Sequence, residues 1–69
     1  MHIDEKTEQW IKRAVSEIRK EGDTQDNAGR HSLAVRFYDR ADAIELAAFR
    51  VANGCPMKGD KDTLKPFFS

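Results

Sequence analysis

Disulfides, clustered metal ligands and long apolar runs are all missing from this 69-residue sequence. The single cysteine, Cys55, excludes an intrachain disulfide, and a lone thiol is typical of a reducing compartment. His2 and His31 lie far apart and in no zinc-ligand spacing, so we expect neither a metal nor a cofactor. A chain this short buries only about 60% of its unfolded surface, so it usually needs a disulfide, a metal or a partner chain to be stable. Since the first two are not expected here, a partner chain remains.

An excess of charge of one sign is also lacking, since 12 Lys and Arg residues balance 12 Asp and Glu residues. This balance gives no basic field to attract nucleic acid, which stays possible as a partner but is not favoured. No apolar run approaches the roughly 18 residues of a membrane-spanning helix, so we expect no membrane association. The opening MHIDEKTEQW is charged, unlike a signal peptide, and we expect a cytoplasmic protein.

What the sequence does contain is helical periodicity, first over residues 4–21. One apolar stripe follows the i, i+3, i+4, i+7 spacing, with Trp10 at its edge, and supplies four predicted core residues: Ile11, Ala14, Val15 and Ile18. Asp4 suits the N-cap, and Gly22 suits the left-handed position after the last turn. We therefore predict a helix from about residue 4 to about residue 21.

The polar segment GDTQDN at residues 22–27 predicts a turn, and a second helix follows from about residue 28 to about residue 53. Gly54 provides the C-cap, and Pro56 prevents the helix from continuing. The length of the turn favours an antiparallel hairpin covering residues 1–54. Residues 55–69 hold two prolines, a glycine and many charges, and predict an irregular tail. The fold class is all-α.

The second helix is apolar on two faces. A main face supplies the predicted core residues Leu33, Phe37, Ala41, Ile44, Ala48 and Val51, and a further cluster holds Val35, Tyr38, Leu46 and Phe49. The single stripe of the first helix cannot cover both faces. We predict that the further cluster is the interface of a homodimer, in which two hairpins form a four-helix assembly. The alternative is a monomer in which Leu64, Phe67 and Phe68 fold back over that cluster.

Catalytic patterns are not evident. The first helix carries no Glu-x-x-His pair, no glycine-rich phosphate loop occurs, and no nucleophile has an orienting group near His31. We predict a protein without enzymatic activity that binds an unidentified protein partner. Possible partner-binding residues are the exposed arginines and the apolar end of the tail: Arg30, Arg36, Leu64, Phe67 and Phe68. The same arginines allow the alternative of a nucleic-acid-binding regulator.

A charged helix, a polar turn, a longer alanine-rich helix with DRADAIELAAFRVA and a short tail together resemble the small helical accessory proteins from the early regions of lambdoid phages. The plan is also similar to that of plasmid-encoded hairpin regulators that dimerise into four-helix bundles. The resemblance implies a modulator of host or phage machinery, located in the host cytoplasm, and it assigns no functional residue. A toxin-like factor that takes over the host is a further alternative.

Overall fold

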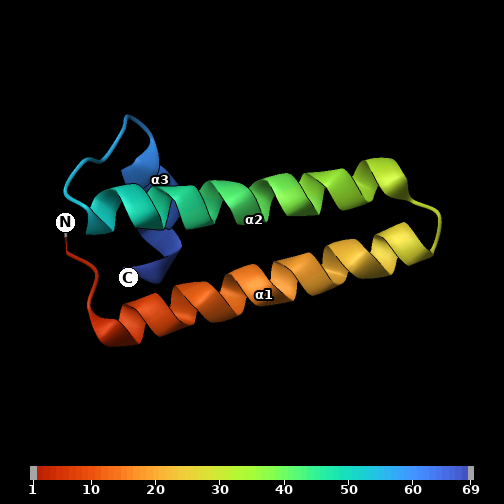
Figure 1. Cartoon of the computed structure of the whole chain (residues 1–69), viewed down its shortest axis with the longest axis horizontal. Coiled ribbons are helices and arrows are strands. Elements are labelled where there is room, and N and C mark those ends of the chain that lie inside the picture. Colours follow the sequence, from red (N-terminus) through yellow and green to blue (C-terminus); the bar gives the residue numbers. More distant parts are fainter. Residues whose placement is uncertain (1, 69) are drawn as a thin grey trace.

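The computed structural model describes residues 2–68, which form two long antiparallel helices and a short helical tail. The long helices are α1 (Glu5–Asn27) and α2 (His31–Ala52), and they pack along their length (Figure 1). The tail contains α3 (Asp60–Leu64) and a 3-10 turn, η1 (Lys65–Phe67). This architecture confirms the predicted all-α hairpin. Among residues 2–68, neither α1 nor α2 combines the length and the hydrophobicity that a membrane-spanning helix needs, and α3 is too short.

The start of α1 follows the sequence prediction. The side chain of Asp4 accepts a hydrogen bond from the backbone N–H of Thr7 at 2.7 Å, which satisfies one of the free donors at the helix end. Glu5 and Glu8 then place negative charge in the first turn, where the helix dipole favours it.

The predicted end of the first helix, however, is wrong. α1 continues to Asn27 through the segment predicted as a turn, and Gly22 lies buried inside it rather than at its end. A Cβ atom at Gly22 would lie 2.7 Å from Cε1 of Tyr38, so glycine serves there for close packing between helices. The turn is confined to residues 28–30, and Gly29 has the positive φ of 82° that glycine adopts without strain.

The second helix starts three residues later than predicted and ends within one residue of the prediction. α2 begins at His31, and its N-cap residue Arg30 makes no side-chain capping bond. After its last residue, Ala52, Gly54 takes a φ of 74° and turns the chain away. Capping by Gly54 is therefore confirmed.

A single hydrophobic core joins α1, α2 and α3, and it contains many of the predicted residues. Its buried members are Ile11, Val15, Ala41, Ile44, Ala47, Val51 and Leu64. Among the other predicted core residues, four are only half-buried: Ala14, Ile18, Phe37 and Ala48. Leu33 is 38% exposed, so its assignment to the core was wrong. Ala34, which lies on the same apolar arc of the second helix, is buried as well.

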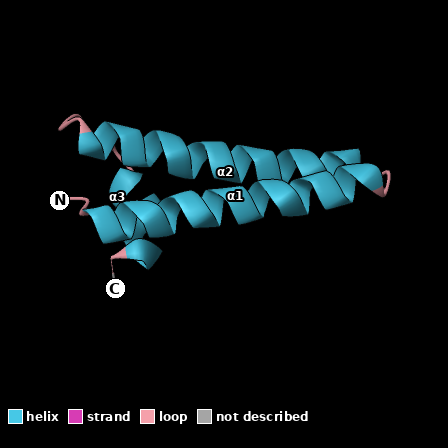
Figure 2. Ribbon diagram, turned by 60° about the horizontal axis from the view of Figure 1, so that its bottom comes forward, coloured by secondary structure: helices cyan, strands magenta, loops and turns pink. Residues whose placement is uncertain are grey.

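The tail is not irregular, because it forms a helix that packs on the hairpin. α3 contacts α2, and η1 reaches across to α1 (Figure 2). Leu64 is fully buried, and the carboxylate of Asp60 accepts hydrogen bonds from Arg50 Nε at 2.9 Å and Nη2 at 2.7 Å. The backbone N–H of Met57 donates to the same carboxylate at 2.8 Å, which also fixes the loop before α3.

Candidate interaction surfaces

The second apolar cluster of α2 stays uncovered although the tail folds back. Val35 is 53% exposed, Leu46 is 54% exposed and Phe49 is 67% exposed. Leu64 enters the main core instead, on the side of the hairpin where α3 lies. The alternative in which the tail covers this cluster is therefore wrong. We call the uncovered side of the hairpin the front face; it contains Val35, Leu46 and Phe49.

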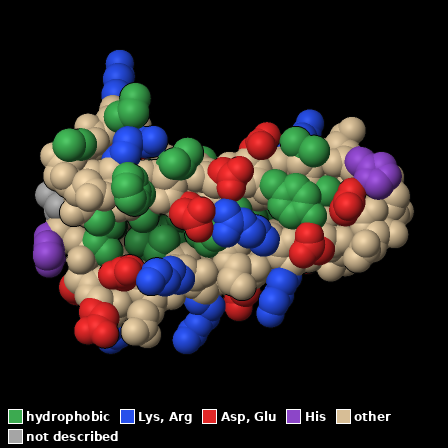
Figure 3. Space-filling view, viewed as in Figure 1, with side chains coloured by type: hydrophobic (Ala, Val, Ile, Leu, Met, Phe, Trp, Pro, Cys, Tyr) green, Lys and Arg blue, Asp and Glu red, His purple; other side chains and the backbone are tan. Residues whose placement is uncertain are grey.

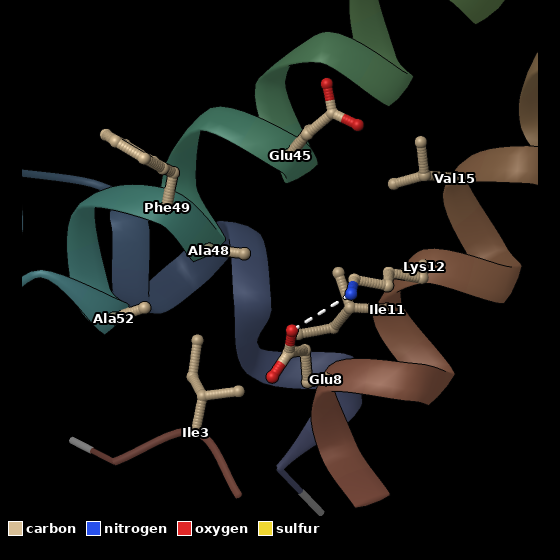
Figure 4. A pocket seen from close by; sticks show the side chains of 9 residues that line it. All are labelled: Ile3, Glu8, Ile11, Lys12, Val15, Glu45, Ala48, Phe49 and Ala52. Atoms are coloured by element: carbon tan, nitrogen blue, oxygen red, sulfur yellow. Dashed lines mark ion pairs between the residues drawn. The ribbon is translucent and has the colours of Figure 1, made fainter. Parts of the chain in front are cut away.

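A groove opens on the front face between the two long helices, beside Phe49. It encloses about 270 Å³, and Figure 4 shows α3 passing behind it. Hydrophobic side chains lie sunk between the helices at the end of the hairpin where α1 begins (Figure 3). The residues that line the groove are Ile3, Glu8, Ile11, Lys12, Val15, Glu45, Ala48, Phe49 and Ala52. Most of its wall is therefore apolar, with charge at the rim.

Arg19 bridges the two long helices next to this groove. Its guanidinium donates to Asp42 at 3.0 Å and to the two carboxylate oxygens of Glu45 at 3.2 and 3.3 Å. These hydrogen bonds raise the pKa of Arg19 above its ordinary value. The two carboxylates are largely exposed and the Arg19 side chain is 40% exposed, so the bridge orients the helices more than it stabilises them.

Tyr38, predicted at the dimer interface, belongs instead to the contact between α1 and α2. It is half-buried, its ring packs against Gly22, and its hydroxyl donates a hydrogen bond to Asp23. That bond, together with desolvation and the nearby carboxylate charge, raises the pKa of Tyr38 to about 12. Tyr38 is thus engaged within its own chain, while Val35, Leu46 and Phe49 are left to form the exposed surface.

The predicted partner-binding residues lie in different settings. Leu64 is fully buried and cannot contact a partner, which corrects its assignment. Phe67 is half-buried and meets Trp10 edge-on, with ring centroids 5.5 Å apart, and Phe68 is half-buried against the core. Arg30 donates to the side chain of Gln25 at 3.1 Å and so closes the turn. Arg36 is exposed on α2.

The ion pair that fixes the tail was not predicted from the sequence. The hydrogen bonds from Arg50 and from the backbone of Met57 lower the pKa of Asp60 to about 2. Both charged residues were visible in the sequence, but their pairing depends on how the loop at residues 53–59 turns the tail back onto α2. No spacing rule within a single helix connects them.

Residues 2–68 contain no group of three or more His, Cys, Asp or Glu side chains placed to hold a metal ion. Cys55 is a free, exposed thiol. Comparison of the chain with protein-family models, with curated proteins and with solved structures gives no match.

Proposed function

We propose that the chain is a non-enzymatic homodimeric binding protein that modulates another protein. The observation that carries the proposal is the front face, where Phe49 is 67% exposed directly beside an apolar groove. An aromatic side chain next to an apolar hollow is typical of the central contact of a protein interface. Our proposal follows the sequence prediction that this face of α2 meets a second chain.

The total surface area supports a partner of the proposed size. A compact monomer of 7.9 kDa is expected to expose about 4,400 Å². This chain exposes 5242 Å², because its dimensions of 39 × 24 × 19 Å make it a narrow rod. This excess arises from the elongated shape, and it is comparable with the roughly 800 Å² that an interface of standard size would cover on each partner.

A second copy fits because the front face carries both a projection and a hollow. In a twofold dimer, each patch meets its own copy, so Phe49 of one protomer can enter the groove of the other and the reverse contact follows by symmetry. Ile3, Ala48 and Ala52 line the part of the groove that is free of charge. The pairing of two hairpins gives the predicted four-helix arrangement.

The test replaces Phe49 with glutamate and compares the variant with Met57→Glu by sedimentation equilibrium. Met57 is a matched control, because it is 62% exposed and its side chain does not line the groove. We expect Phe49→Glu to raise the dimer dissociation constant at least about 30-fold, as loss of a central aromatic contact does. Met57→Glu should leave it unchanged.

Cross-linking checks the twofold arrangement. In a Cys55→Ser background, Phe49→Cys places a thiol near the symmetry axis, whereas Leu33→Cys places one away from the front face. Mild oxidation should give a disulfide-linked dimer of the first variant only. A wild-type chain that sediments as a monomer at high micromolar concentration would refute the dimer, and the front face would then need another occupant.

We further propose, on the resemblance of the sequence layout to phage accessory proteins, that the chain modulates host or phage machinery in a bacterial host. Expression of the wild-type chain in a bacterial host should change growth or expression of a reporter, and Phe49→Glu should abolish the change if the dimer is the active form. An equal effect of both chains would separate the biological role from dimerisation.

A further inference from the structure

A second candidate surface lies on the side of the hairpin where the tail packs, and we call it the tail face. Phe67 stands between two hollows on this face. The first encloses about 430 Å³ between α1 and the tail, and the second encloses about 300 Å³ between α1, α2 and the tail. Trp10, which is 50% exposed, lines the first hollow, and Ile18 and Pro66 line the second.

The wall that separates the hollows is held in place by the chain. Leu64 is completely buried in the core directly before η1, and the bidentate pair between Arg50 and Asp60 fixes the start of α3. The edge-on contact of Phe67 with Trp10, at an interplanar angle of 84°, holds η1 against α1. The tail therefore presents Phe67 as a fixed ridge, and a binding segment would meet a preformed surface.

The charged residues that line the two hollows are all cations, although the chain as a whole has no net charge. Lys6 and Arg13 line the first hollow, Arg40 lines the second, and neither lining contains a carboxylate. Within residues 2–68, the ion pairs involve Lys12, Arg19, His31 and Arg50 but none of these three cations. The front groove differs, because its rim combines two glutamates with one lysine.

We propose that the tail face binds an acidic amphipathic segment of the partner protein. Two apolar side chains of the segment enter the hollows on either side of Phe67, and its carboxylates meet Lys6, Arg13 and Arg40. This inference rests on the proposed function, since it names the chemistry of the protein that the dimer modulates. The complementary charges steer the encounter and fix the register, while the apolar contacts supply most of the affinity.

An acidic segment fits the tail face better than nucleic acid does. Affinity for nucleic acid depends strongly on how many phosphates Lys and Arg neutralise, and the two hollows offer only three cations on a chain without net charge. The rings of Trp10 and Phe67 already contact each other edge to face, which leaves less ring surface on which bases could stack. The rings of Trp10 and Phe67 in the first hollow and the mostly apolar lining of the second instead suit side chains that project from one face of a helix.

The experiment follows peptide binding by the fluorescence of Trp10, the only tryptophan in the chain. The full-length protein is titrated with a designed peptide of roughly 16 residues, in which leucines follow the i, i+3, i+4, i+7 spacing and glutamates fill the other face. A matched peptide carries lysine in place of every glutamate. We expect saturable quenching or a spectral shift of Trp10 with the acidic peptide, at least about tenfold tighter than with the basic peptide and weakened by salt.

Charge-reversal variants locate the site. Lys6→Glu with Arg13→Glu should weaken binding of the acidic peptide at least about tenfold. Lys20→Glu with Lys58→Glu makes the same change in net charge on exposed positions outside both hollows, and it should change binding less than about twofold. Circular dichroism confirms that both variants fold. The Phe49→Glu variant should still bind the acidic peptide. This measurement therefore tests the tail face separately from the proposed dimer.

Four results would overturn the proposal. One is the absence of any saturable Trp10 signal, and another is equal affinity for the acidic and basic peptides. The third is tighter binding of a single-stranded oligonucleotide than of the acidic peptide, which would assign the face to nucleic acid. If Lys6→Glu with Arg13→Glu dissociated a self-assembly in sedimentation, the occupant would be a second copy of this chain, and the acidic partner would be excluded.

Discussion

Truncation of Leu64 tests whether the tail is an integral part of the fold. Leu64 is completely buried in the cluster that also holds Ile11, Val15 and Ile44. Leu64→Ala removes these contacts and leaves a cavity, which costs about 2–5 kcal/mol at buried leucines. The free energy of unfolding expected for 69 residues is only about 3–10 kcal/mol. The variant should therefore lose a large part of its stability.

The assays are urea denaturation and thermal unfolding, each followed by circular dichroism and by Trp10 fluorescence, since circular dichroism reports the helices and Trp10 lies against the tail. Each kcal/mol lost lowers the melting temperature of a domain of this size by about 4–8 °C, so a fall of at least about 8 °C is expected. Leu33→Ala is the matched control, because Leu33 is 38% exposed and its truncation should cost about 1 kcal/mol or less.

Measurement at two protein concentrations separates folding from association, because a dimer makes the midpoint depend on concentration. If Leu64→Ala and Leu33→Ala lost the same small amount of stability, the tail would not be packed as described. The tail face, whose ridge depends on Leu64, would then lose its structural basis.

Three further predictions concern the contact between α1 and α2 and the ion pair of the tail. Gly22→Ala should destabilise the protein by about 1–3 kcal/mol although alanine has the better helix propensity, because the new Cβ would lie 2.7 Å from the ring of Tyr38. Chemical denaturation measures the change in the free energy of unfolding. The hydrogen bond to Asp23 raises the pKa of Tyr38, the only tyrosine, to about 12, so the contribution of this bond to stability is complete below pH 10 and is lost between pH 10 and 12. Ultraviolet titration should show that Tyr38 ionises late, and Tyr38→Phe should abolish the loss of stability between pH 10 and 12. The ion pair with Arg50 lowers the pKa of Asp60 to about 2, so the contribution of Asp60 to stability is present above its ordinary pKa of 3.8 and is lost as the pH falls toward 2. In thermal melts at different pH, the Asp60→Asn variant should lack this loss of stability in acid.

The sequence allowed local features to be predicted where a short-range rule determines them. Asp4 is an N-cap whose bond partner lies three residues away, and Gly54 ends α2 with a positive φ. The periodic apolar residues of both helices likewise gave the main core. Each of these features depends on neighbours within a turn or two of helix.

Features that depend on contacts between distant segments could not be predicted. Gly22 has the residue type of a helix end, but the ring of Tyr38 packs against it and the polar residues after it continue α1. In that extension, Thr24 donates to the carbonyl of Lys20 and Gln25 bonds to Glu21, so polar side chains are accommodated within the helix. The tail was missed for the same reason, since the Arg50–Asp60 pair appears only after the chain has turned.

The short turn at residues 28–30 has a consequence for the order of folding. α1 and α2 are joined by a tight connection, so their contacts near the turn form between residues close in sequence and need little loop closure. α3 contacts α2, but Leu64 also enters the core shared with α1 and Phe67 meets Trp10 of α1, so docking of the tail is complete only when the hairpin has closed. Tail docking therefore belongs after the rate-limiting step, and its loss should hasten the unfolding of the molecule while leaving its folding rate nearly unchanged.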